Sequence, residues 1–86
     1  MKKIIKFYAN WCSPCRAYAS IFENTTSNYA DQVEIHNINI DEDTSGLANK
    51  YKVMSIPSTV LVKEDGSFIK KDGMLSEHEL TELILS

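Results

Sequence analysis

The stretch FYANWCSPC, residues 7–15, holds both cysteines of the 86-residue chain and its only tryptophan. It overlaps a short apolar run, residues 3–9, whose Ile, Phe and Tyr side chains favour a β-strand. Pro14 suits the first turn of a helix, where its missing N–H group costs nothing, so a helix is expected to begin near Cys12 or Ser13. The cysteine pair is therefore predicted to lie where a strand ends and a helix begins.

Working outward from this junction, apolar periodicity and turn residues predict the remaining elements. They are the rest of the first helix to about Ala30, strands at 33–40, 58–63 and 68–71, a short helix at 44–51, and a last helix capped by Ser76 and Glu79. A turn at 64–67 joins the last two strands as a hairpin. The short fourth strand ends in charged residues, as edge strands often do.

The resulting order, β-α-β-α-β-β-α, predicts an α/β fold. Its first β-α-β unit should contain parallel strands, and the hairpin should add two antiparallel ones. Helices should then cover both faces of a mixed four-stranded sheet. A chain of this length has room for one domain, residues 1–86.

Composition and charge limit the kinds of partner and the cellular location that the sequence predicts. The net charge of −3 disfavours nucleic acid and anionic membranes as partners. No apolar run approaches the roughly 18 residues of a membrane span, and Lys6 and Asn10 interrupt the apolar start, which argues against a signal peptide. The expected location is the cytoplasm, where structural disulfides are rare, so a close cysteine pair indicates redox or metal chemistry.

Two cysteines three residues apart in the first turn of a helix lie on one face, at a Cα separation of about 5–6 Å that suits a disulfide. At the helix end, Cys12 should face unpaired N–H groups and the positive end of the helix dipole, which favour its thiolate. Cys15 should be more shielded. The spacing thus predicts thiol–disulfide exchange, with Cys12 as the nucleophile and Cys15 as the resolving thiol.

Two other interpretations of the pair are less favoured. A structural zinc site needs four ligands, and the only other soft candidates, His36 and His78, lack partner spacing. An inert disulfide across so short a loop would stabilise the fold little. We therefore expect no metal and no organic cofactor, because the two cysteines themselves carry the electrons.

The pattern WCSPC after a strand, followed by Ile56-Pro57 and then by Gly73 before the last helix, resembles the thioredoxin family. The resemblance runs through nearly the whole chain, although thioredoxin's N-terminal strand and helix have no counterpart, as in compact thioredoxin-like proteins. It implies a monomeric reductase of disulfide-containing proteins. It also implies an NADPH-dependent thioredoxin reductase as the electron donor.

The resemblance further implies a cis proline at Pro57, with the backbone before it pairing to an extended substrate segment. The implied docking surface consists of Trp11, Ser13, Pro14, Ile56, Pro57 and Gly73. The acidic run 41–43 offers no evident clamp for glutathione and is interpreted as a solvated helix start.

Departures from the family are concentrated around the cysteines. Ser13 replaces a glycine, while Lys6 and Asn37 stand where thioredoxin has a buried Asp and its Lys partner. A lysine beneath the site would favour thiolates, which makes Lys6 a candidate modulator. Because burying a lysine is costly, a solvated Lys6 at the end of the sheet is the favoured interpretation.

Two alternative functions stay open at this point. One is a glutaredoxin-like, glutathione-dependent oxidoreductase; the other is a non-catalytic binding module that keeps the thioredoxin fold. Glutaredoxins favour an aromatic residue between the cysteines, Val before the cis proline and a Gly-Gly pair. This chain instead has Ser13 and Pro14 between its cysteines, Ile56 before the proline and a single Gly73.

Overall fold

The computed structural model describes all residues, 1–86, and has the predicted order of strands and helices. The strands are β1 (Lys2–Tyr8), β2 (Val33–Asn39), β3 (Ser58–Val62) and β4 (Phe68–Asp72). The helices are α1 (Ser13–Thr26), α2 (Leu47–Lys50) and α3 (Glu77–Leu85), with two single 3₁₀ turns, Ser27–Tyr29 and Ile40–Glu42. None of the helices is both long and apolar enough to cross a membrane.

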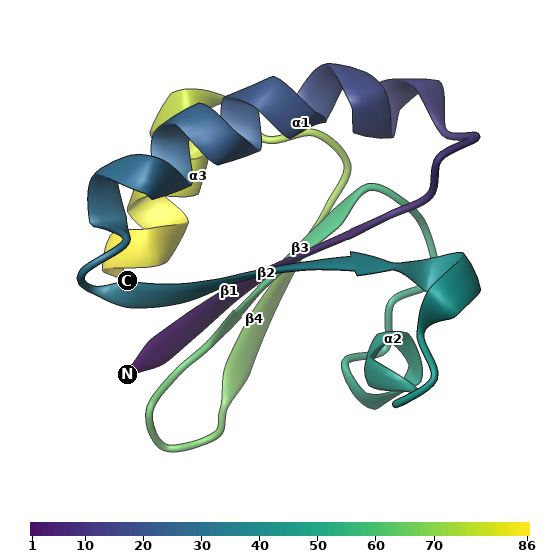
Figure 1. Ribbon diagram of the computed structural model, residues 1–86. Helices are drawn as coiled ribbons and strands as arrows, with labels where there is room; N and C mark the ends of the chain where they lie inside the picture. Colours follow the sequence, from purple (N-terminus) through teal and green to yellow (C-terminus); the bar gives the residue numbers. More distant parts are fainter.

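The four strands form one mixed sheet in the order β2-β1-β3-β4 (Figure 1). Strand β1 runs parallel to β2 and antiparallel to β3, and β3 pairs with β4 through the predicted hairpin. This confirms the predicted topology, including the place of β4 at an edge. It also explains why β1 has apolar residues on both faces, since it lies inside the sheet.

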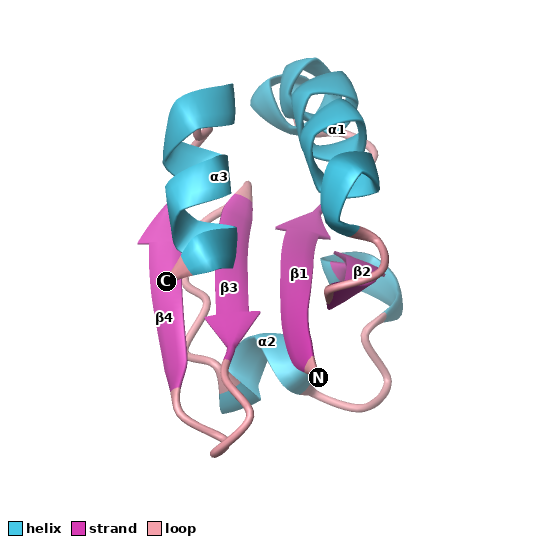
Figure 2. Ribbon diagram, turned by 90° about the vertical axis from the view of Figure 1, so that its left-hand side faces the viewer, coloured by secondary structure: helices cyan, strands magenta, loops and turns pink.

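Helices cover both faces of the sheet, as predicted. Helices α1 and α3 lie side by side on one face, and α2 lies on the other (Figure 2). Because side chains alternate along a strand, β1 sends Ile4 into the core under α1 and α3, and sends Ile5 and Phe7 into the core near α2. Both Ile4 and Phe7 are fully buried, so β1 contributes to both cores.

The register of β1 against β3 positions the functional loops. Phe7, near the end of β1, pairs with Ser58 at the start of β3. The chain leaving β1 toward α1 therefore emerges beside the chain entering β3. This brings the cysteine stretch next to the Ile56-Pro57 segment, which lies some forty residues further along the sequence.

The short helix α2 differs most from its predicted extent of 44–51. Gly46 adopts a left-handed conformation with φ of +70°, which cannot belong to the helix, so α2 begins only at Leu47. The carboxylate of Asp43 reaches forward and accepts hydrogen bonds from the N–H groups of Leu47 and Ala48, at 3.0 and 2.8 Å. At α3, by contrast, the predicted capping box between Ser76 and Glu79 is confirmed.

Candidate active site

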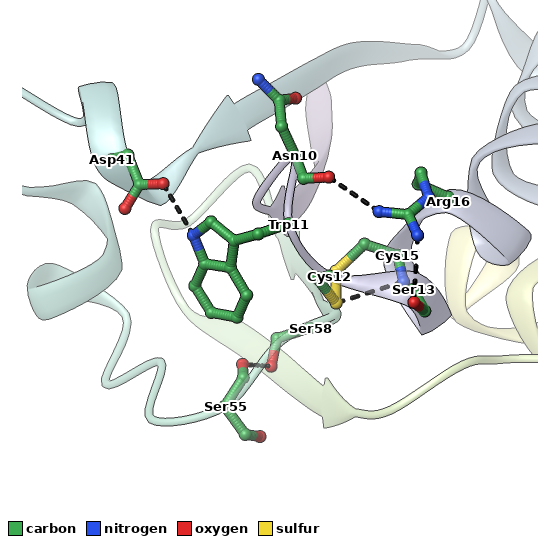
Figure 3. Close-up of a disulfide and its surroundings, with 9 residues drawn as sticks. All are labelled: Asn10, Trp11, Cys12, Ser13, Cys15, Arg16, Asp41, Ser55 and Ser58. Atoms are coloured by element: carbon green, nitrogen blue, oxygen red, sulfur yellow. Dashed lines mark hydrogen bonds between the residues drawn. A yellow bond between two sulfur atoms is a disulfide. The ribbon is translucent and has the colours of Figure 1, made fainter.

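The cysteine pair sits at the N-terminus of α1 as a disulfide, with Cα atoms 5.2 Å apart (Figure 3). Cys12 is the N-cap residue of the helix, in extended conformation, and its Sγ accepts a hydrogen bond from the backbone N–H of Cys15 at 3.2 Å. Both residues are buried, with exposed fractions of 6% for Cys12 and 2% for Cys15. Cys12 therefore has a sulfur in the N-capping position, where a negative charge is stabilised.

An arginine that sequence reasoning missed braces the active-site loop. The guanidinium of Arg16 donates one hydrogen bond to the carbonyl oxygen of Asn10, at 2.9 Å, and another to the Oγ of Ser13, at 3.0 Å (Figure 3). These contacts join Asn10, two residues before Cys12, to Ser13, which lies between the two cysteines. Only the position of Arg16, directly after Cys15, could have suggested this role, because its partners depend on how the loop folds.

Trp11 is 65% exposed beside the cysteines, although it is a large aromatic residue. Its ring is held by a hydrogen bond from Nε1 to the Oδ2 of Asp41, at 2.9 Å (Figure 3). The interpretation of the acidic run 41–43 as a solvated helix start was incomplete for Asp41, which is exposed in the first turn of the 3₁₀ helix Ile40–Glu42 but also orients Trp11. It was also incomplete for Asp43, which caps α2.

The Ile56-Pro57 peptide bond is cis, as the resemblance implies, and Ile56 packs against the cluster that contains both cysteines. Neighbouring residues hold this segment in place. Gly73 donates its N–H to the carbonyl of Pro57 at 2.8 Å, and the buried Ser58 donates its hydroxyl to the carbonyl of Ser55 at 2.6 Å (Figure 3). Neither the N–H nor the C=O of Ile56 takes part in the backbone hydrogen bonds of the chain.

The interpretation of Lys6 as a solvated lysine is wrong. The side chain lies on the α1 face of β1, because that strand alternates, and the residue is only 6% exposed. Its Nζ lies 5.3 Å from the ring centroid of Tyr8 and 5.2 Å from that of Phe22. Burial lowers the pKa of Lys6 from its ordinary value, and the Glu23 carboxylate partly opposes this shift.

Lys6 and Cys15 line one groove behind the active site, together with Asn37, the register partner of Lys6 on β2. Sequence reasoning placed Lys6 correctly in a strand, but it predicted a solvated side chain where the structure has a buried one. The two aromatic rings that flank the ammonium reduce the cost of burying it. Phe22 comes from α1, a contact between distant segments that no local pattern reports.

The residues for a metal centre are not brought together. No group of three or more His, Cys, Asp and Glu side chains that could hold a metal ion occurs in the chain. His36 lies in β2 and His78 in α3, and each instead lies within ion-pair distance of a nearby glutamate on the same element. What the geometry does offer is a disulfide between two cysteines at a helix N-terminus.

Comparison with known proteins agrees with this geometry. The thioredoxin family model matches residues 1–86. The chain is 33% identical over 82 residues to a thioredoxin of Staphylococcus epidermidis and 32% identical to one of Staphylococcus aureus, in each case covering 95% of this chain and 78% of the relative. The crystal structure of the germline-specific thioredoxin Deadhead from Drosophila melanogaster superposes with a TM-score of 0.84 at 27% identity, covering 98% of this chain and 78% of that one.

Fold, cysteine geometry and sequence similarity thus lead to one conclusion. The family match favours a thioredoxin-like protein-disulfide reductase over the glutaredoxin-like and non-catalytic alternatives. The Cys12–Cys15 disulfide is the redox-active couple of such an oxidoreductase. The chain belongs to the thioredoxin family.

Proposed function

We propose that Cys12 is the attacking thiol and Cys15 the resolving thiol of this reductase. The observation that carries the assignment is the backbone N–H of Cys15 aimed at the Sγ of Cys12, at 3.2 Å. A donor in that position stabilises a thiolate on Cys12, whereas Cys15 lies deeper and lacks an equivalent cap.

The proposed cycle moves two electrons in two exchange steps. The Cys12 thiolate attacks one sulfur of a target disulfide; a mixed disulfide forms, and the other target sulfur leaves as a thiolate. Cys15 then loses its proton and attacks Cys12, which releases the second target thiolate and forms the Cys12–Cys15 disulfide. The target is reduced by two electrons, and the disulfide form of the protein is the product of the turnover.

The proposed docking surface surrounds the disulfide and consists of Trp11, Ser13, Pro14, Ile56, Pro57 and Gly73. Two features support it. The exposed Trp11 is held in a fixed orientation by Asp41, so it offers a pre-organised wall. The backbone groups of Ile56 are free of internal partners, so an extended substrate segment can pair with them as an added strand.

The proposed setting follows from family membership. We place the protein in the cytoplasm as a monomer, reduced by an NADPH-dependent thioredoxin reductase and acting on protein disulfides without a metal or an organic cofactor. The net charge of −3 disfavours nucleic acid and anionic membranes as alternative partners. In this scheme Lys6, buried in the same groove as Cys15, favours the thiolate form of the reduced pair.

The donor assignment is tested by offering the oxidised protein two reducing systems separately. Reduction by thioredoxin reductase with NADPH is expected, measured as NADPH consumption coupled to reduction of insulin disulfides. The Cys12→Ser variant is the matched control and should consume no NADPH. Reduction by glutathione alone, with no turnover by the reductase, would contradict the proposal and favour the glutaredoxin-like alternative.

A further inference from the structure

An open groove of about 870 Å³ lies behind the active site, where α1 crosses β1 and β2. Its lining includes Lys6, Cys15, Phe22, Glu23 and Ile35. Cys12 and the residues of the proposed docking surface do not contribute to it. The groove is thus distinct from the surface that meets protein substrates, although it reaches the second cysteine.

The Lys6 ammonium group lies in this groove without a direct ion pair, although the Glu23 carboxylate acts on it electrostatically. Lys6 is 6% exposed, and its ammonium group takes part in none of the ion pairs of the chain. An ammonium has three N–H donors, and the rings of Tyr8 and Phe22, at 5.3 and 5.2 Å, satisfy it only through their faces. The Nζ makes no hydrogen bond within the chain and is not among its enclosed unsatisfied atoms, so its donors are open to the groove. The natural complement of a cation at the base of a partly apolar groove is an anion entering from that groove.

The walls specify what kind of anion fits. Half of the lining residues are hydrophobic, among them Phe22 and Ile35, so a fully hydrated inorganic ion would leave these walls unused. The other cation of the groove, Arg16, already donates to Asn10 and Ser13. The Glu23 carboxylate also lines the groove, and it would repel the second negative charge of a doubly charged ligand.

We propose that this groove binds a small organic monocarboxylate, with the carboxylate on the Lys6 Nζ and the apolar body against Phe22 and Ile35. This site goes beyond the proposed reductase function and does not depend on it. Binding is coupled to the redox state, because a carboxylate on Lys6 repels the thiolate of the reduced cysteine pair, whose Cys15 lines the same groove. The disulfide form therefore binds the ligand more tightly than the thiolate form, and by reciprocity the ligand favours the disulfide.

Hexanoate is a suitable probe, titrated into the oxidised, isotope-labelled protein while amide chemical shifts are recorded. The largest shifts are expected at Lys6, Phe22, Glu23 and Ile35. Acetate has the charge without the apolar body, and hexanol has the body without the charge. Each should bind about tenfold more weakly than hexanoate, because each loses one of the two contributions.

Variants separate the charge from the rest of the groove. Lys6→Met keeps the length of the side chain and should weaken hexanoate to the level of hexanol, whereas Glu23→Gln should strengthen it about two- to threefold. Lys6→Gln serves as a second neutral variant should Lys6→Met perturb the fold. Equal hexanoate affinity in wild type and in both neutral variants, equal affinity for hexanoate and hexanol, or shifts confined to other surfaces would overturn the site.

The redox coupling has its own measurement. Hexanoate affinity is compared between the oxidised protein and the reduced protein at a pH where the thiolate is populated. Weaker binding to the reduced form, by at least about threefold, is expected. Equal affinities would contradict the coupling. The outcome does not depend on any reductase assay, so failure of the proposed function leaves the test intact.

Discussion

The Cα atoms of the two cysteines lie 5.2 Å apart, yet the two residues have different surroundings. The front is the side of the proposed docking surface, and the rear is the side of the groove that Lys6 lines. Cys12 faces the front of the molecule, where backbone donors and the Trp11 wall are supplied by loop geometry. Cys15 faces a rear groove whose character depends on one buried side chain, Lys6. The difference teaches that backbone geometry positions the disulfide at the front, while we propose that one side chain, Lys6, tunes its chemistry from the rear.

The largest effect on the rear side is expected from Lys6→Met. Removing the buried cation should disfavour the thiolate of the reduced pair and move the thiolate titration to higher pH by roughly 1 unit, about a tenfold loss of thiolate at a given pH. Thiolate absorbance followed against pH measures this shift. A matched control is Lys3→Met, at an exposed lysine near the beginning of β1, which should leave the titration in place. Equal titrations of Lys6→Met and wild type would remove Lys6 from the tuning of the site.

The stability of the oxidised protein gives the next effect. The folded pKa of Lys6 lies below its ordinary value of 10.5 because of burial, so the folded state disfavours the charged form. Lys6→Met should therefore be more stable than wild type near neutral pH, by on the order of 1 kcal/mol. Denaturant unfolding at a series of pH values measures this difference.

The sign of the pH dependence is a further check. Between the lowered folded pKa of Lys6 and 10.5, the unfolded wild type binds more protons than the folded one, so wild-type stability rises with pH and the gap to Lys6→Met narrows. Burial raises the pKa of Tyr18, which destabilises both proteins above about pH 10 and cancels in the comparison. Glu23 and Arg16 also line the groove, but both residues are present in wild type and in Lys6→Met. A gap that widens with pH would contradict burial of a charged Lys6.

At the front, Asp41→Asn should have a smaller effect. The substitution removes the charge that accepts the Trp11 N–H but keeps the shape, at a cost of about 1 kcal/mol for that contact. The KM for a protein disulfide should rise about two- to threefold with little change in kcat, since the cysteines are untouched. A large fall in kcat with KM unchanged would assign Asp41 a role other than orienting Trp11.

The smallest effect on activity is expected from Ser76→Ala, far from both sides of the disulfide. Loss of the capping box should lower stability by about 1 kcal/mol, because the N–H of Glu79 loses its partner. Activity below the unfolding temperature should equal that of wild type. A change in activity would show that α3 affects the active site, which would contradict the account that only the front and rear surroundings of the disulfide determine its chemistry.

The front of the site was predictable because its determinants are local. Pro14 and the spacing of Cys12 and Cys15 specify a helix N-terminus, and that geometry alone orients the backbone donor. The position of Pro57 beside them required the family resemblance, since the β1–β3 register is a long-range property. Trp11 was recognised, but not that Asp41 would hold it.

The rear of the site was not predictable from local patterns. Placing Lys6 on the α1 face follows from strand alternation, but its burial depends on Tyr8 and on Phe22 from a different element. The general rule that lysines stay solvated therefore gave the wrong answer here. The same limit applies to Arg16, whose contacts exist only once the loop has closed.

The central claim, that the two cysteines have unequal roles, is tested most directly by trapping the intermediate. Cys15→Ser and Cys12→Ser are each incubated with a protein disulfide, and covalent complexes are identified by intact mass and peptide mapping. The account predicts a stable mixed disulfide at Cys12 in Cys15→Ser and none at Cys15 in Cys12→Ser. Equal trapping by both variants, or trapping only through Cys15, would contradict it.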